Sequence, residues 1–160
     1  MGRSDETASR TYPTVPRVGV AGVVISDDGC VLLIQRGKEP MRGRWSVPGG
    51  VLELGETMVA GVRRELVEET GLRVTPQMVL TAIDRIDVDE SGRVRYQYVV
   101  VDWLCTLEAG QRMDAVVSGD DAMDARWVRR KDLLLAEYDL AEVTLDVIEK
   151  AFGYVEGMSR

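Results

Sequence analysis

The sequence predicts a single α/β domain, with α+β as the alternative arrangement of the same elements. The chain has 160 residues, enough for one domain with a sizeable core. Hydrophobic residues make up 45% and charged residues 29%, which is typical of a globular protein. Short β-like runs and two longer stretches with helical spacing divide the chain, without internal repeats or low-complexity tracts.

The first elements are expected to be extended. Residues 18–26 are rich in Val, Gly, Ala and Ile and predict a buried strand. Asp27-Asp28-Gly29 is a turn signal, and residues 30–34 return as a second strand, which predicts a hairpin. Residues 36–44 hold two glycines, a proline and five charges and predict a loop. Trp45-Ser46-Val47 then predicts a short strand that stops at a Pro-Gly-Gly sequence.

The middle of the chain predicts a helix followed by two strands. Residues 57–70 suit a helix, with Thr57 as the N-cap and Gly71 as the residue that ends it. Residues 79–88 and 94–107 are β-like, and the Glu-Ser-Gly-Arg sequence between them suits a hairpin turn.

The last third predicts a loop, one strand and a second helix. Residues 108–124 are acidic and predict a long loop, and such loops are often functional. Residues 125–128 predict a strand, and residues 140–152 predict a helix with one apolar face. Asp139 and Glu142 are expected to form its capping box.

The N-terminal sequence, the cysteines and the length of the apolar runs predict the domain bounds and the cellular location. Residues 1–14 are polar and predict a disordered tail in front of a domain at residues 15–155. Cys30 and Cys105 lie within or beside apolar runs, so we expect reduced, buried thiols in a cytoplasmic protein. No apolar run approaches the roughly 20 residues that span a bilayer, so no membrane partner is expected.

The absence of histidine and the negative net charge exclude several kinds of catalytic site and of partner. The chain has no histidine, which excludes Ser-His-Asp and Cys-His catalysis and histidine metal sites. Its net charge of −7 argues against a nucleic-acid polymer as partner, because such surfaces are normally basic. An acidic protein that handles phosphates needs a cation to mediate.

One face of the first predicted helix concentrates carboxylates. Glu65, Glu68 and Glu69 fall at i, i+3 and i+4, and the acidic stripe borders the apolar stripe. Like charges at this spacing repel, and a hard cation such as Mg²⁺ or Mn²⁺ removes that cost. Gly61 leaves room for a ligand to approach. A solvated acidic face is the alternative, and for this spacing alone it is the commoner outcome, since Glu is a frequent helix former.

A wider pattern around this helix resembles the Nudix box, G-x5-E-x7-R-E-U-x-E-E-x-G-U, where U is a bulky aliphatic residue. Chance agreement is on the order of one in 10⁹ per start site. The Trp-Ser-Val-Pro-Gly-Gly sequence at residues 45–50 also resembles the lead-in to the box that is common in this family. With the order of the strands before and after the box, the resemblance extends over residues 17–152. The matching positions are Gly50, Glu56, Arg64, Glu65, Leu66, Glu68, Glu69, Gly71 and Leu72.

The resemblance implies an α/β/α sandwich around a mixed β-sheet, with the box as loop–helix–loop. It implies metal ligands at Glu65, Glu68 and Glu69, which also serve in catalysis, and a Mg²⁺ or Mn²⁺ cofactor. Gly50 and Glu56 join this metal site, and Glu56 supports the helix through the arginine at position 64.

The implied reaction is attack by water on one phosphorus of a pyrophosphate linkage in a small nucleotide. Residues 95–102 and 119–122 look most like ADP-ribose pyrophosphatase-like members, so ADP-ribose or a similar NDP-sugar is favoured. The alternatives are a MutT-type (d)NTP pyrophosphatase that removes damaged nucleotides and a catalytically silent nucleotide sensor. Many relatives are dimers, so a homodimer is expected as one possible state.

The general base has several candidates. A box glutamate serves in some family members, and a residue of a later loop serves in others. The later candidates here are Asp120, Asp121 and Asp124, of which we choose Asp121. A solvated acidic loop is an equally good reading of these three residues.

Substrate contacts are expected outside the box. Arg36 and Arg44 are candidates to contact phosphate or base, although lone arginines near a loop often face solvent. Trp45 and Tyr98 are candidates to stack on a nucleobase, and core packing is the alternative for both.

Overall fold

The strands form two sheets in the computed structural model, which describes residues 10–119 and 121–159. The four-stranded sheet has the order β4 (Gly49–Val51), β1 (Arg17–Val24), β6 (Val94–Leu107) and β5 (Val74–Val88). In it β1 runs parallel to β6, and the other pairs are antiparallel. The three-stranded sheet has the order β3 (Trp45–Ser46), β2 (Cys30–Arg36) and β7 (Ala122–Arg129), all antiparallel. The predicted mixed sheet is therefore confirmed.

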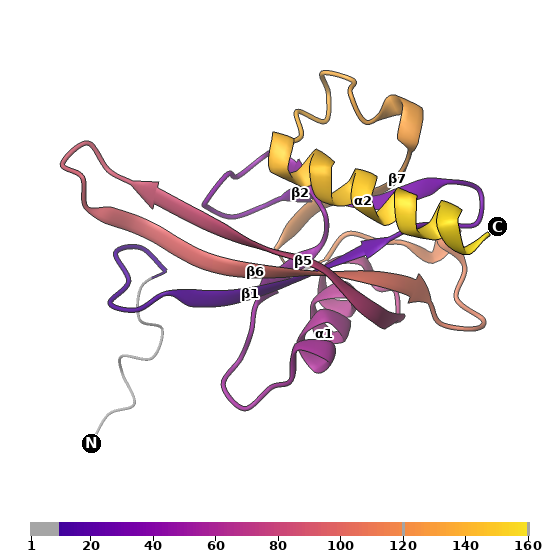
Figure 1. Cartoon of the computed structure of the whole chain (residues 1–160), viewed down its shortest axis with the longest axis horizontal. Helices are drawn as coiled ribbons and strands as arrows, with labels where there is room; N and C mark the ends of the chain where they lie inside the picture. The colour runs from indigo at the N-terminus through magenta and orange to yellow at the C-terminus, as the bar shows by residue number, and fades with distance from the viewer. Residues whose placement is uncertain (1–9, 120, 160) are drawn as a thin grey trace.

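Two helices cover opposite sides of these strands. Figure 1 shows α1 (Met58–Thr70) on one side of the sheets and α2 (Glu142–Met158) on the other. Short 3₁₀ turns at Met113–Ala115 and Arg130–Asp132 flank β7. This is the α/β/α sandwich that the sequence predicts.

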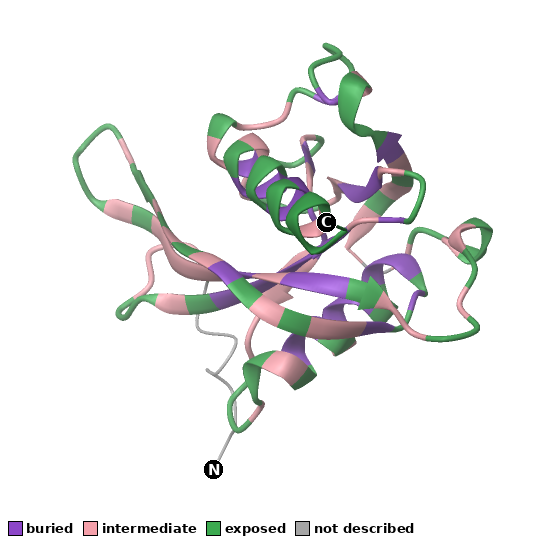
Figure 2. Ribbon diagram, turned by 45° about the vertical axis from the view of Figure 1, so that its right-hand side comes forward, coloured by how far each residue is buried: buried purple, intermediate pink, exposed green. Residues whose placement is uncertain are grey.

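Strand β1 forms the centre of both layers of the core. Val20 and Val24 pack in the cluster that contains α1, whereas Ala21 and Val23 pack in the cluster that contains α2. Successive strand residues point to opposite faces, so a strand covered on both sides is apolar along its whole length. Figure 2 shows buried residues along the inner face of α2 and exposed residues on its outer face.

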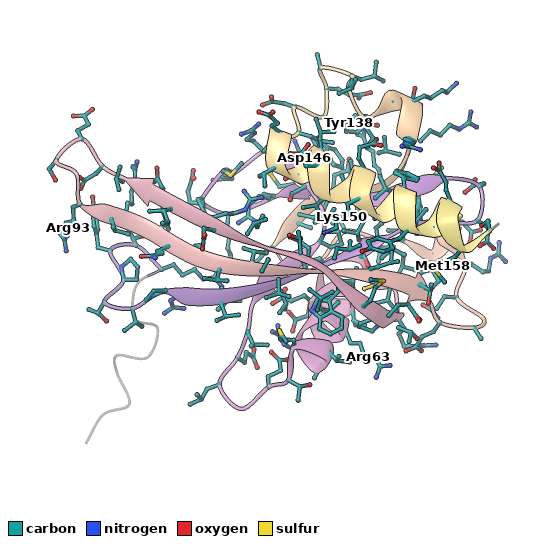
Figure 3. The ribbon with its side chains drawn as sticks, in the orientation of Figure 1. Arg63, Arg93, Tyr138, Asp146, Lys150 and Met158 are labelled. Atoms are coloured by element: carbon teal, nitrogen blue, oxygen red, sulfur yellow. The ribbon has the colours of Figure 1, made fainter. Side chains whose placement is uncertain are left out.

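Strands β5 and β6 extend beyond the body of the protein as a two-stranded arm. The hairpin turn predicted at residues 90–93 is confirmed, with Gly92 at a φ of 81°. Figure 3 places Arg93 at the far end of the arm. Tyr12 lies against this end, where its hydroxyl donates to Asp89 Oδ2 at 2.8 Å. Residues 1–9 of the predicted tail lie outside the described residues.

The hairpin predicted for β1 and β2 is present only at its turn and at one bridge, and the continuous pairing expected between the two strands is wrong. The turn at Gly29 is present, and an isolated bridge joins Ile25 to Val31. Past that bridge, β1 pairs with β4 and β6, while β2 pairs with β3 and β7. The two strands diverge because each finds partners that are distant in sequence, and a local turn signal does not specify these partners.

Three element boundaries also differ from the prediction. The helix α2 begins at Glu142 after Ala141, which makes no side-chain cap. The proposed capping box is therefore wrong, and Asp139 adopts a φ of 40° outside the helix. The Gly-Gly sequence expected only to stop a strand forms β4, and β5 begins at Val74.

Both cysteines are free and buried, as the sequence predicts. No helix within the described residues is both long and apolar enough to cross a membrane.

Candidate active site

Both ends of α1 are capped, and these caps fix where the acidic face of the helix begins and ends. Thr57 is the N-cap, and its Oγ1 accepts a hydrogen bond from the Ala60 amide at 3.2 Å. Gly71 ends the helix with a φ of 72°, and its amide donates to the Val67 carbonyl at 2.9 Å. Because a left-handed residue is least costly as glycine, this position sets where the helix stops. Both predicted caps are confirmed.

Two of the three helix glutamates are buried against strand β4. Glu69 Oε2 accepts a hydrogen bond from the Gly49 amide at 3.0 Å. The carboxylate of Glu65 lies where a side chain on Gly50 would stand. Glu68 is exposed on the same helix. The glycines of β4 therefore allow the acidic helix face to lie directly on the strand backbone.

Replacing Gly50 with alanine is expected to weaken divalent-cation binding about tenfold or more while the fold is kept. The added methyl group overlaps the Glu65 carboxylate and forces that side chain away from β4. Titration of Mg²⁺ by calorimetry measures the change, with circular dichroism as the check on folding. Gly55→Ala is no control, because Gly55 has a positive φ. Gly153→Ala is a suitable control, since nothing lies within 4 Å of its added methyl. An unchanged affinity in Gly50→Ala would contradict the close packing.

Arg64 links three box carboxylates to the strand backbone. It donates to both carboxylate oxygens of Glu56, at 2.7 and 3.0 Å, and to Glu65 Oε1 at 2.7 Å. Further bonds reach Glu68 Oε2 at 3.2 Å and the Val51 carbonyl at 3.1 Å. The planar guanidinium can make these bonds at once because it carries five donors in a fixed geometry.

The carboxylates of the site experience opposite electrostatic environments. Burial raises the pKa of Glu69 to about 8, against the opposing effect of the Gly49 amide. Burial also raises the pKa of Glu65, partly offset by Arg64. The hydrogen bond from Arg64 lowers the pKa of Glu56. Glu69 and Glu65 are thus poorly solvated acids that a cation would stabilise in their charged form.

The donor set fits a hard divalent cation. Within residues 10–119 and 121–159 no three acidic or cysteine side chains already converge as a ligand cluster. Glu65 and Glu68 are turned to Arg64, and Glu69 is turned to a backbone amide. Carboxylate oxygens are the preferred ligands of such ions, and Glu65 raises the pKa of Glu69 by repulsion. Each of these bonds engages one oxygen of its carboxylate, so the other oxygen can face a cation while the bond is kept.

The affinity for Mg²⁺ is expected to rise with pH up to about pH 8. Glu69 must lose its proton to act as a ligand, and its pKa is raised to about 8. Binding then releases a proton, so affinity increases about tenfold per unit below this pH and levels off above it. Calorimetry at pH 6.5, 7.5 and 8.5 measures the slope. Glu69→Gln removes the titrating group and is expected to flatten the profile, whereas a flat profile in the unchanged protein would contradict the raised pKa.

One pocket runs from the acidic helix face across the sheet toward α2. Three predicted site residues are not part of its lining among the described residues, namely Arg44, Glu56 and Glu68. The predicted site residues that line it are Arg36, Trp45, Gly50, Glu65, Glu69, Tyr98 and Asp121. Tertiary structure therefore brings together candidates from six separate segments of the chain.

The later acidic candidates take different positions. Asp121 lines the pocket and forms an ion pair with Lys38 Nζ at 2.5 Å. Its carbonyl accepts from the Gly37 amide at 2.7 Å, which holds the loop beside β2. Asp124 pairs instead with Arg126 at 2.9 Å. Asp120 lies outside the described residues.

The remaining predicted contacts differ in what they touch. Arg44 donates to the Asp139 carbonyl at 2.9 and 3.2 Å, on the loop before α2. Trp45 is buried and packs edge-on against Tyr138, with ring centroids 5.4 Å apart. Arg36 Nε donates to the Pro40 carbonyl at 2.9 Å. Trp45 thus lines the pocket and also packs in the core.

Two charged strand residues that line the pocket are not among the predicted site residues. Arg85 of β5 and Asp102 of β6 line the pocket on the face of the sheet that α2 covers. For Asp102 the available signal was a charged residue inside an otherwise apolar run, whereas Arg85 lies between Asp84 and Asp87 and offered no such signal. Asp102 interrupts the run from Val99 to Leu104, but a single charge in a strand does not reveal which side of the sheet it faces.

The fold and the carboxylate-rich helix define a class of hydrolase that acts on phosphorus-containing anhydrides. The NUDIX domain model matches residues 15–150. A MutT-like protein of Streptomyces ambofaciens is 38% identical over 120 residues, which cover 66% of this chain and 75% of that protein. An ADP-ribose pyrophosphatase of Methanocaldococcus jannaschii is 33% identical over 131 residues, covering 82% and 72% respectively.

A solved structure agrees with these sequence matches. The MutT NUDIX hydrolase of Burkholderia pseudomallei superimposes with a TM-score of 0.65 and 29% identity, over 85% of this chain and 98% of that one. The chain belongs to the Nudix hydrolase family and is a pyrophosphohydrolase. Nudix hydrolases generally use a divalent metal.

Proposed function

We propose that this protein is a Mg²⁺-dependent hydrolase that cleaves the diphosphate of a nucleoside diphosphate derivative, with ADP-ribose or a similar NDP-sugar favoured. The observation that carries the proposal is the shared pocket. Buried carboxylates of α1 line it beside β4, and aromatic and apolar side chains such as Tyr98 and Val100 line it on β6, two strands away. A ligand with a charged diphosphate and a flat or sugar-like remainder matches this division.

The roles of the chain's own residues follow from their positions. Glu65, Glu68 and Glu69 would hold the metal, which when bound neutralises phosphate oxygens and lowers the pKa of a bound water. Arg64 orients Glu65 and Glu68 through its hydrogen bonds. These residues contribute by positioning and electrostatics, on which phosphoryl transfer mainly depends.

Asp121 is our proposed general base. It lines the same pocket as Glu65 and Glu69, from the loop that precedes β7. A carboxylate there can take a proton from an attacking water, and its partner Lys38 holds it at the edge of the pocket. Arg36, Trp45 and Tyr98 remain proposed substrate contacts, and Arg44 is proposed to act at the pocket margin.

The second candidate is a MutT-type pyrophosphatase of damaged nucleotides. The similarity to a MutT-like protein favours it as a specific observation. A silent nucleotide sensor is a third reading, which the intact box makes less favoured. We also propose a domain at residues 15–155, a cytoplasmic location and a homodimer as one possible state.

A substrate panel tests the proposal. Purified protein is incubated with ADP-ribose, NDP-sugars, dinucleoside polyphosphates and oxidised dNTPs, with Mg²⁺ or with EDTA, and phosphate is measured after phosphatase treatment. Faster Mg²⁺-dependent turnover of ADP-ribose or an NDP-sugar is expected. Preference for oxidised dNTPs would favour the MutT-type role. Absence of Mg²⁺-dependent turnover on the whole panel would overturn the enzymatic proposal.

A further inference from the structure

Asp102 places a carboxylate on the floor of the pocket. On β6 the residues Tyr98, Val100 and Asp102 alternate with residues of the other face, and all three line the pocket. Asp102 is paired with Ala21 of β1 in the centre of the four-stranded sheet. Its side chain therefore rises from a rigid strand and not from a loop, which favours precise placement of a ligand.

One oxygen of this carboxylate has no partner. Asp102 is 3% exposed, and its Oδ2 is buried without a hydrogen bond to any described residue. A buried acceptor left unpaired costs free energy, more so when it belongs to a charged group. Buried polar groups in native proteins are nearly always satisfied, so this unpaired oxygen on a residue that lines the pocket is a candidate contact for a ligand.

The positive charge of Arg85 offsets the negative charge of Asp102 only in part. Its guanidinium donates to Thr144 Oγ1 of α2 at 3.3 Å and to Met41 Sδ at 3.6 Å. It lowers the pKa of Asp102 by attraction, while burial raises that pKa to about 6. No ion pair within 4.0 Å joins Arg85 and Asp102 among the described contacts. The carboxylate is thus attracted by Arg85 without a direct bond to it, and its Oδ2 is left without a partner among the described residues.

We propose that Asp102 is a specificity-determining residue that accepts a hydrogen bond from a neutral N–H or O–H group in the nucleoside half of the substrate. Phosphate oxygens are excluded as its partner, because two anionic acceptors repel. Asp102 pairs with Ala21, and Ala21 pairs with Gly49, whose amide binds Glu69, so Asp102 lies two strand spacings, about 10 Å, from that amide. With the diphosphate placed at Glu65 and Glu69, the nucleoside half of the ligand is the part that can reach Asp102. This inference rests on the proposed function for the orientation of the ligand.

Two groups of a nucleoside carry the required chemistry. One is the amino or imino group of the base, and the other is a ribose hydroxyl. Both donate a hydrogen bond, and both lose this ability when a single atom is removed. The pair Asp102 and Arg85 would then present one acceptor and one cation to the same ligand, which discriminates against groups with only lone pairs at that position.

The test measures binding of nucleoside 5′-monophosphates, which contain no pyrophosphate bond and are not consumed. Calorimetry with AMP, GMP, CMP and UMP in Mg²⁺ identifies the tightest probe for the unchanged protein. Asp102→Asn keeps the shape of the side chain and is expected to weaken this probe about 10- to 100-fold. The matched control is Asp84→Asn, an exposed carboxylate on the neighbouring strand, for which affinity within about twofold is expected.

Analogues that lack one donor distinguish the two sources. If AMP is the tightest probe, purine riboside monophosphate removes the base amino group, and the 2′-deoxy and 3′-deoxy forms each remove a hydroxyl. The recognised donor is the one whose loss weakens binding about tenfold in the unchanged protein and has a clearly smaller effect in Asp102→Asn, where only a neutral acceptor remains. If Asp102→Asn fails to fold, Asp102→Ser takes its place in the same comparison, and the same loss of discrimination is expected.

Equal binding of all analogues, or of both proteins, would overturn the assignment, as would absence of binding for every probe. Failure of the proposed function is a separate result. A protein that binds monophosphates through Asp102 but hydrolyses nothing in the substrate panel would be a sensor with the same specificity residue.

Discussion

Glu69→Gln is expected to reduce turnover about 1,000-fold and to raise the melting temperature in EDTA. Loss of one ligand from the metal site removes several kcal/mol of transition-state stabilisation, and about 4 kcal/mol corresponds to that factor. The melting temperature is expected to rise, although turnover falls, because the carboxylate of Glu69 is buried. The carboxylate is 5% exposed, whereas the amide is neutral and can still accept from Gly49.

The pH dependence of this stabilisation has a definite sign. Burial raises the pKa of Glu69 from its usual 4.5 to about 8 in the folded protein. The folded state therefore holds the proton more tightly, and the wild-type protein loses stability as pH rises from about 4.5 to about 8. The gain in the variant should be largest near pH 8.5, at about 1–2 kcal/mol, or about 3–6 °C. Thermal melts at pH 5 and 8.5 measure it.

Glu68→Gln is the matched control for this experiment. Glu68 belongs to the same predicted ligand set but is exposed, so its replacement should reduce turnover without the gain in stability. A purely structural cation site makes a different prediction, namely that both variants lower the melting temperature in Mg²⁺ and leave turnover unaffected. Turnover of Glu69→Gln within tenfold of the unchanged protein would contradict a ligand role.

Arg64→Lys is expected to lower both stability and metal affinity although it keeps the positive charge. A lysine cannot reproduce the two bonds to Glu56 together with those to Glu65 and the Val51 carbonyl. The partners are mostly buried, so we expect a loss of about 2 kcal/mol in the free energy of unfolding. Metal affinity should fall about 10- to 100-fold, since the arginine orients the ligands without being one.

Two further variants locate the cause of this effect. Arg63→Lys is the matched control, because Arg63 is the exposed neighbour on α1 (Figure 3) and should change neither quantity. Glu56→Gln should lower the free energy of unfolding and the metal affinity by less than Arg64→Lys does, since one partner of Arg64 is weakened and the others remain. Urea unfolding and Mg²⁺ titration give the two values. Equal behaviour of Arg64→Lys and Arg63→Lys would show that charge alone matters.

The helix of the site was predictable because its determinants are local. Thr57 and Gly71 act within one turn of the helix ends, and three glutamates share a face through the 3.6-residue period. The capping box at Asp139 failed for the opposite reason. Its residue types match a cap, but the loop before α2 is held by Arg44, and the helix starts later. Propensity did not decide the boundary there, since a long-range contact outweighed it.

The sequence by itself determined the fold class, the acidic helix and the need for a cation, because periodicity, caps and the box pattern are read along a continuous segment. Only the tertiary structure decided which strands pair, and therefore which side chains share the pocket. β1 and β2 adjoin in sequence yet lie in different sheets. Asp102 reaches the pocket floor through its pairing with β1, about 80 residues earlier in the chain. Strand pairing is set by burial on both faces of the sheet, which local sequence does not encode.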